Sequence, residues 1–103
     1  MANKYHAVRT WSELCGRWFA SKAECRRGEE LRMLELAGEI TDLEYQPKFK
    51  LCDKPKITYS ADFIYEENGK VVVEDVKGKL LRETRVKLVW LKEKYNVEVI
   101  LSK

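Results

Sequence analysis

Residues 57–77 read ITYSADFIYEENGKVVVEDVK, and this stretch decides how the chain folds. Two runs rich in β-branched and aromatic residues flank Asn68-Gly69, a dipeptide that strongly favours a tight hairpin turn. The sequence therefore predicts antiparallel strands over 57–67 and 70–77. A two-residue turn also fixes the register, with Glu67 opposite Lys70 and each further pair one residue outward.

This register places charged residues together. Counting outward from the turn, Asp62 lies directly opposite Asp75, with Cβ atoms about 5 Å apart. Lys77 is two residues beyond Asp75 and therefore points to the same face, opposite Ser60. Glu74 is the rival acid, but strand alternation puts it on the other face.

Two carboxylates that face each other repel, so the pair needs a compensating charge. Lys77 offers one, and Mg²⁺, or Mn²⁺ as a substitute, would offer more, because hard cations prefer oxygen ligands. Such a metal polarises a phosphoryl oxygen and acidifies a bound water, and Lys77 could orient that water. An Asp-x-Lys triplet alone is usually a solvated strand face. The register and the valines around it favour a site for phosphodiester hydrolysis.

The first helix is expected over 22–37. Ser21, followed three residues later by Glu24, matches a capping box, and Gly38 fits the left-handed residue that ends a helix. Its apolar stripe is expected to include Leu31, Met33 and Leu34.

The remaining helices and strands are predicted from changes in the spacing of apolar residues along the chain. A strand near 43–49 is interrupted by Pro47, which suggests an edge or a bulge. A basic helix over 82–95 precedes a last buried strand over 97–101, and this succession favours a parallel crossover. The helix is expected to turn Val86, Val89 and Trp90 inward.

The order is thus αβββαβ, and the predicted fold class is α/β (mixed α+β), with a central mixed sheet flanked by helices. With 103 residues, the chain suits one domain over 1–103. Residues 1–17 are expected to form a basic N-terminal arm or a partly packed segment, and residues 18–103 the core.

Composition limits the class of protein. A hydrophobic fraction of 45% supports a real core, and a formal net charge of +3 favours an anionic partner only slightly. The three cysteines include no Cys-x-x-Cys pair, so neither a structural zinc site nor a disulfide framework is expected. Without an apolar leader or membrane-length stretch, the sequence predicts a cytoplasmic protein.

The stretches 60–63 (SADF) and 73–78 (VEDVKG) resemble the PD-(D/E)XK nuclease superfamily. More closely, the whole chain is similar to short phage-encoded proteins of that superfamily, and through them to endonuclease I-type Holliday junction resolvases. The matching motifs also include Lys4-Tyr5, residues 21–24 (SKAE) and residues 46–49 (QPKF). One departure is Ala61, where the superfamily has proline.

The resemblance implies a restriction-endonuclease-like core and a set of roles. The catalytic residues would be Glu24, Asp62, Asp75 and Lys77, and the Mg²⁺ ligands would be Glu24, Asp62, Asp75 and Val76. Glu24 has a second interpretation, because residue N3 of a capping box does purely structural work. Gln46 is a possible addition, whereas the lone His6 fits a surface or DNA-contacting role better than that of a general base.

Basic residues are candidate DNA contacts, namely Lys79, Arg82, Arg85, Lys87, Lys4 and Arg9. The alternative is an ordinary solvated helix face. The three tryptophans, Trp11, Trp18 and Trp90, are expected in the core rather than as base-stacking platforms.

The expected function is that of a metal-dependent, structure-specific DNA endonuclease, most specifically a Holliday junction resolvase in DNA recombination. A four-way junction presents two equivalent strands, so a homodimer is expected. The alternatives are a nuclease of other specificity, such as a nickase or end-processing enzyme, and a non-catalytic DNA-binding module.

Overall fold

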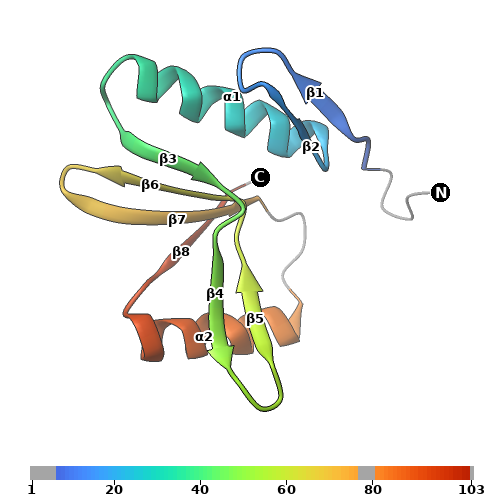
Figure 1. Cartoon of the computed structure of the whole chain (residues 1–103), viewed down its shortest axis with the longest axis vertical. Coiled ribbons are helices and arrows are strands. Elements are labelled where there is room, and N and C mark those ends of the chain that lie inside the picture. The colour runs from blue at the N-terminus through green and yellow to red at the C-terminus, as the bar shows by residue number, and fades with distance from the viewer. Residues whose placement is uncertain (1–6, 77–80, 103) are drawn as a thin grey trace.

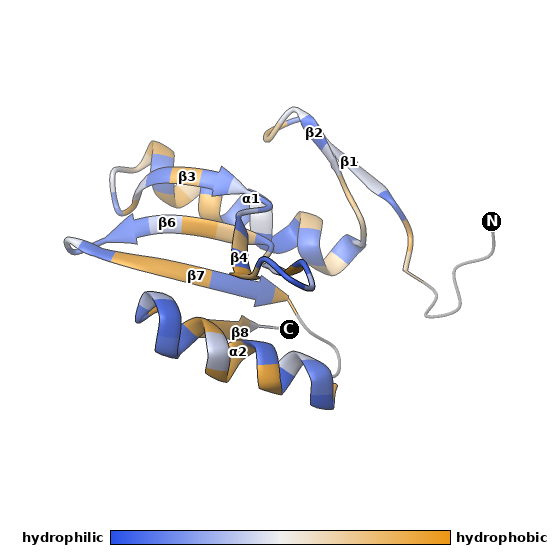
Figure 2. Ribbon diagram, turned by 60° about the horizontal axis from the view of Figure 1, so that its bottom comes forward, coloured by the Kyte–Doolittle hydropathy of each residue, from blue (hydrophilic) through white to orange (hydrophobic). Residues whose placement is uncertain are grey.

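The computed structural model describes residues 7–76 and 81–102, and the predictions for Lys4, His6, Lys77 and Lys79 lie outside these residues. The described elements appear in Figure 1 in the order β1 (Thr10–Ser12), β2 (Arg17–Phe19), α1 (Lys22–Leu36), β3 (Thr41–Tyr45), β4 (Lys48–Cys52), β5 (Ile57–Ser60), β6 (Phe63–Glu67), β7 (Lys70–Val76), α2 (Arg82–Tyr95) and β8 (Val99–Ser102). They form a mixed α+β fold with a helix on each side of the central sheet (Figure 2).

The central sheet has the strand order β3-β6-β7-β8. The hairpin register is confirmed, because Glu67 pairs with Lys70 and Phe63 pairs with Glu74. Asn68 and Gly69 have φ values of 53° and 76°, the left-handed backbone that such a turn requires. The predicted crossover is also confirmed, since β8 runs parallel to β7.

Side-chain alternation along β7 separates two cores. Val72 and Val76 pack against the cluster beneath α1, which contains Cys25, Leu31, Phe63 and Tyr65. Val73 points the other way, into a second cluster with Leu51, Tyr59, Ala61 and Leu91. Asp75 shares the face of Val73, and Glu74 shares the face of the α1 core, as the alternation predicted.

Two predicted strands are each broken in two. The strand expected over 43–49 becomes β3 and β4, and the one expected over 57–67 becomes β5 and β6. Gln46 has a φ of 57° and Pro47 has no amide proton, so the ladder cannot continue through them. Hydrogen bonds from the Gln46 amide to the Asp62 carbonyl (3.0 Å) and from the Ala61 amide to the Pro47 carbonyl (3.1 Å) hold the bend.

Beyond the bend, β4 and β5 form a separate hairpin that projects toward α2 (Figure 1). Ser60 pairs with Lys48 in this hairpin, and the expectation that it faces Lys77 lies outside the described residues. Side chains of α2 donate hydrogen bonds to main-chain carbonyl groups of this hairpin. Tyr95 donates to Lys50 at 2.7 Å, and Lys87 donates to Thr58 at 3.1 Å.

The buried face of α2 differs from the prediction. Val86, Val89 and Trp90 are exposed, whereas Leu88 and Leu91 pack into the second core. Trp11 and Trp18 are exposed as well, so the prediction that the tryptophans lie in the core is wrong. The pattern of apolar residues does not decide which face of α2 is buried. The contact between α2 and the sheet decides it, and that contact cannot be derived from the sequence alone.

The N-terminal segment is more ordered than the expected arm. β1 and β2 pair as an antiparallel hairpin against α1, with Phe19 almost fully buried. The Ser12 hydroxyl, also buried, donates a 2.7 Å hydrogen bond to Glu29 of the helix. Among the described residues, no helix is long and apolar enough to cross a membrane. All three cysteines are free thiols.

Candidate active site

Three acidic side chains meet near the point where the two hairpins diverge. Asp62 lies in the bend just before β6, Asp75 lies near the end of β7, and Glu24 lies in the first turn of α1. The charge of Asp75 acts on both of the other carboxyl groups, and the charge of Glu24 acts on Asp62. The structure therefore places Asp62 beside Asp75, with Glu24 close enough for its charge to act on Asp62.

The Asp62 carboxyl group is held at the end of β7. It accepts a 2.7 Å hydrogen bond from the Val76 amide and shares a hydrogen bond with the Asp75 carboxyl group. Burial raises the pKa of Asp62 to about 7, and the Asp75 hydrogen bond and the charges of Asp75 and Glu24 act in the same direction. The ionised form of Asp62 is thus disfavoured by burial and by the acids around it.

Asp75 is 2% exposed, and sequence analysis missed one of its partners. The Tyr59 hydroxyl donates a 2.5 Å hydrogen bond to Asp75 Oδ2. Burial raises the pKa of Tyr59, and the carboxylate beside it adds to this effect, so the phenol remains a donor. A buried tyrosine needs a hydroxyl partner, but no sequence pattern says which residue provides it.

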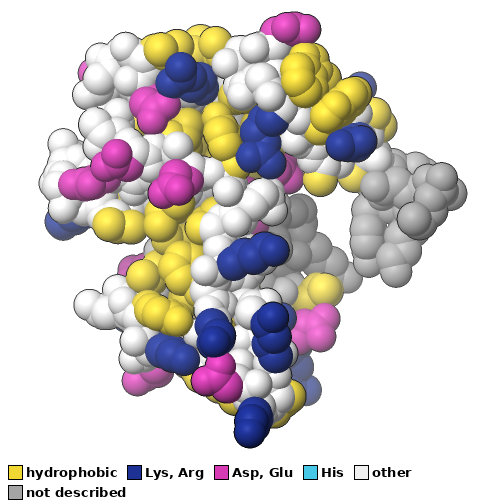
Figure 3. Space-filling model, in the orientation of Figure 1, with side chains coloured by type: hydrophobic (Ala, Val, Ile, Leu, Met, Phe, Trp, Pro, Cys, Tyr) yellow, Lys and Arg dark blue, Asp and Glu magenta, His cyan; other side chains and the backbone are white. Residues whose placement is uncertain are grey.

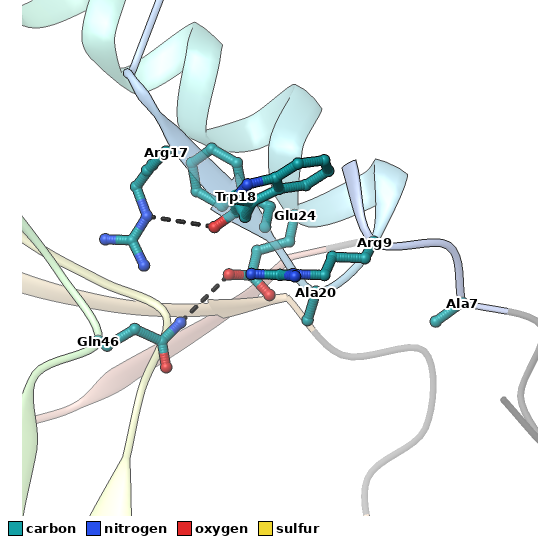
Figure 4. Close-up of a pocket in the computed structure, with 8 residues that line it drawn as sticks. Ala7, Arg9, Arg17, Trp18, Ala20, Glu24 and Gln46 are labelled. Carbon is teal, nitrogen blue, oxygen red and sulfur yellow. Dashed lines mark hydrogen bonds between the residues drawn. The ribbon is translucent and has the colours of Figure 1, made fainter. Parts of the chain in front are cut away.

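The two roles expected of Glu24, helix capping and catalysis, depend on two different groups of the residue. Its main-chain amide donates a 3.1 Å hydrogen bond to the Ser21 hydroxyl, which caps α1. Its carboxylate accepts a 3.2 Å hydrogen bond from the Gln46 side-chain amide, across the bend (Figure 4). Burial raises the pKa of Glu24, partly offset by the charge of Arg17. Capping therefore leaves the carboxylate available for chemistry.

Glu74, the alternative to Asp75 as the acid of β7, has a structural role. Its carboxylate is buried on the α1 face, where Arg27 grips it with hydrogen bonds of 2.5 and 2.9 Å. Tyr65 and Ser102 also donate to it, at 2.9 and 3.0 Å. Burial alone would raise its pKa, but these donors outweigh burial and lower it. Glu74 is an ionised, fully paired group that links α1 to the sheet.

A pocket of about 540 Å³ opens beside Glu24 and Gln46 (Figure 4). Its lining comes from β2, the segment before β1, the start of α1 and the bend, and comprises Ala7, Arg9, Arg17, Trp18, Phe19, Ala20, Glu24 and Gln46. Arg9 was predicted as a DNA contact, whereas Trp18 was expected in the core and Arg17 was not singled out. Of the three acids, the pocket is lined by Glu24 alone.

The candidate DNA contacts occupy different surroundings. Arg82 and Arg85 are exposed on α2, whereas Lys87 is half-buried and bound to the Thr58 carbonyl. Sequence analysis overlooked a set of exposed lysines on the β4–β5 hairpin and its turn, namely Lys48, Lys50, Lys54 and Lys56. Basic side chains gather over this hairpin on the face shown in Figure 3.

The acidic residues suit a hard divalent cation in type. The pKa of Asp62 is raised beside the Asp75 carboxyl group, and a bound cation could replace the proton on Asp62 while relieving the repulsion between the two acids. In the described ranges 7–76 and 81–102, however, no three acidic, histidine or cysteine side chains already converge as a metal cluster. Glu24, held by Gln46, would have to turn toward the aspartates to complete one.

Comparison with known families gives one match. The chain belongs to the family described as "Protein of unknown function (DUF1064)". The match covers residues 2–102, so it includes every element of the fold and every acid of the site. No curated protein and no solved structure matches the chain significantly. Membership of this family identifies the chain without supplying an activity.

Proposed function

We propose that the protein is a metal-dependent DNA endonuclease of the PD-(D/E)XK type, acting on branched DNA as a Holliday junction resolvase. The observation that carries this proposal is the Asp62–Asp75 pair, in which Asp75 is buried, Asp62 is half-buried, and burial and the adjacent Asp75 raise the pKa of Asp62. Such an acid pair costs stability, so its presence favours a functional role over a structural one. The strand–helix–strand crossover of β7, α2 and β8 adds support from the fold.

In this proposal, Asp62, Asp75 and Glu24 hold Mg²⁺, with Val76 contributing its main-chain carbonyl oxygen. When bound, the ion polarises a phosphoryl oxygen and acidifies a water. The protein prepares the ligands: the Val76 amide orients Asp62, the Tyr59 hydroxyl orients Asp75, and the Gln46 amide holds Glu24. Lys77, next in the chain after β7, is the proposed partner of the attacking water.

The DNA would approach over basic surfaces beside this site. The β4–β5 hairpin presents exposed lysines, and Arg82 and Arg85 lie exposed on α2. Contacts of this kind neutralise phosphates without reading sequence, which suits an enzyme that recognises the shape of its substrate.

A homodimer remains part of the proposal. Val86, Val89 and Trp90 form an exposed apolar surface on α2, with 57%, 65% and 36% of their areas accessible. Grouped apolar side chains of this kind mark association surfaces more often than free surface. A symmetric dimer built on α2 would present one acidic site to each of two equivalent DNA strands.

A cleavage assay tests the proposal. Purified protein is incubated with synthetic four-way junctions, forks, duplexes and single strands, with Mg²⁺, Mn²⁺ or a chelator. We expect metal-dependent cleavage of junctions, abolished by Asp75→Ala and retained by Asp53→Ala, which removes an exposed acid on the β4–β5 turn. Absence of cleavage on every substrate, or undiminished cleavage by Asp75→Ala, contradicts the proposal.

The same assay separates the alternatives. Preference for nicked or end-bearing duplexes indicates a nickase or an end-processing nuclease. A non-catalytic DNA-binding module predicts DNA binding without cleavage and no heat of Mn²⁺ binding in calorimetry, with or without Asp62→Asn.

A further inference from the structure

The β1–β2 hairpin presents two tryptophans to solvent. Trp11 and Trp18 face each other across the hairpin, with ring centroids 5.5 Å apart in an edge-to-face arrangement, and their exposed fractions are 43% and 47%. Large aromatic surfaces are normally buried, so an exposed pair calls for an explanation. The edge contact with Trp11 orients the Trp18 ring and leaves the residue 47% exposed.

Two arginines accompany these rings. The Arg9 guanidinium lies 4.7 Å from the centre of the Trp18 ring. Arg17 lies 4.5 Å from the centre of the Tyr45 ring, and its Nε donates to the Trp18 carbonyl at 3.4 Å. Both cations are therefore positioned by aromatic neighbours, and Figure 4 shows them on either side of Trp18.

This aromatic and cationic surface leads to the candidate active site. Arg9, Arg17 and Trp18 line the same pocket as Glu24 and Gln46, and the pocket volume of about 540 Å³ is in the range of ligand-binding clefts. A ligand with a flat aromatic ring stacked on Trp18 and with anionic groups at the two arginines would fit the rim of this pocket. Nucleotides combine these two features, and only unpaired nucleotides expose the face of a base.

We propose that the β1–β2 hairpin binds single-stranded DNA, with Trp18 stacking on an unpaired base and with Arg9 and Arg17 contacting the neighbouring phosphates. The inference rests on the proposed function for its biological use, since it makes DNA with an unpaired segment beside the branch the preferred substrate. The binding itself needs neither metal nor catalysis. The hairpin then guides the strand along the pocket toward Glu24.

Binding in a metal-free buffer tests the inference. Fluorescence anisotropy of a labelled oligo-dT of about 12 nucleotides, within the span of single-strand sites, is compared with that of a duplex of equal length. We expect tighter binding of oligo-dT. Trp18→Leu should weaken that binding roughly 5- to 150-fold, the range expected for loss of one stacked base, and Trp18→Phe should retain most of it.

Matched variants separate stacking from charge and from general damage. Leu14→Ala removes another exposed apolar side chain from the same hairpin, outside the pocket, and should bind normally. Arg9→Ala should weaken binding of both DNA forms and reduce the salt dependence by about one phosphate contact. Circular dichroism melting verifies that each variant folds.

The outcomes distinguish this inference from the nuclease proposal. Equal binding of oligo-dT by the wild type and Trp18→Leu, or no preference for oligo-dT over duplex, overturns the inference even if junctions are cleaved. Conversely, the expected binding pattern without any cleavage supports the hairpin as a DNA-binding site and removes the proposed nuclease activity.

Discussion

The Val76 amide donates a 2.7 Å hydrogen bond to the carboxylate of Asp62, which lies 14 residues earlier in the chain. This bond joins the bend before β6 to the end of β7, so both strand ends must be in place for the site to exist. Asp62 is consequently oriented before any ligand arrives. Its fixed position forces it against Asp75, and this proximity has measurable consequences.

Replacing Asp62 should stabilise the protein at high pH. The raised pKa of about 7, against an ordinary 3.8, means that the folded state binds the proton more tightly than the unfolded state. Stability therefore falls as the pH rises from about 4 to 7. Each pKa unit corresponds to about 1.4 kcal/mol, and Asp62→Asn removes this loss, so we expect a gain of at least about 1 kcal/mol at pH 8, or at least about 4–8 °C in melting temperature.

The measurement is thermal melting of wild type and Asp62→Asn in chelator at pH 8 and at pH 4. The difference between the two proteins should shrink at pH 4, where Asp62 is protonated in the folded state and the pH is close to its pKa of 3.8 in the unfolded state. A variant that is less stable than the wild type at pH 8 contradicts the assignment of strain to this carboxyl pair.

Divalent cations should stabilise the wild type by binding the same acids. At a concentration 100 times its dissociation constant, Mn²⁺ would add about 2.7 kcal/mol to the free energy of unfolding. Because the ion must displace the proton that Asp62 holds below a pKa of about 7, its effect should be smaller at pH 6 than at pH 8. Melting curves with and without Mn²⁺ measure this effect, and Asp75→Asn should show little response. An equal response in Asp75→Asn would place the bound ion elsewhere.

Substitutions at Ser21 and Glu24 should separate the effect of helix capping on stability from the effect of the Glu24 carboxylate on cleavage. Ser21→Ala removes the helix cap, which typically costs about 1 kcal/mol of stability, while leaving the Glu24 carboxylate in place. Glu24→Gln keeps the amide that donates to Ser21 but removes the charge near Asp75. We expect Ser21→Ala to melt earlier and still cleave DNA, and Glu24→Gln to fold normally and lose cleavage at least 100-fold. Normal cleavage by Glu24→Gln would leave Glu24 with a structural role alone.

Arg27 should be important for stability but not for chemistry. It pairs with Glu74, which is 1% exposed, and removing one member of a buried pair typically costs about 3–5 kcal/mol. Arg27→Met should therefore lower the free energy of unfolding by roughly that amount in urea titrations. Arg26→Met, at the exposed neighbouring position of α1, is the control and should change stability little. Similar losses in both variants would show that the Glu74 pair is not the cause.

Val89 should report on self-association. It is 65% exposed in the apolar surface of α2, so Val89→Glu should leave the fold intact and add a charge that opposes docking of a second copy. We expect sedimentation equilibrium to show a dimer for the wild type and a monomer for the variant. A wild type that is monomeric at all concentrations removes α2 as a dimer surface.

The parts of the fold that depend on short stretches of sequence were predictable. Asn68-Gly69 fixes the hairpin register because few other dipeptides adopt two successive left-handed conformations, and the observed pairing of Phe63 with Glu74 follows from it. Ser21 and Asn96 similarly mark one end each of α1 and α2. Strand alternation then separates Asp75 from Glu74, because successive side chains of a strand point to opposite faces.

What the sequence by itself determined is therefore local: the hairpin, the helices and the face on which each β7 acid lies. Only the tertiary structure decided the bend at Gln46 and Asp62, the Tyr59 partner of Asp75 and the exposure of Trp18. These features depend on contacts between residues far apart in the chain, where packing selects one partner among many chemically equivalent candidates. Turn chemistry and strand period act within a few residues, so they could not make that selection.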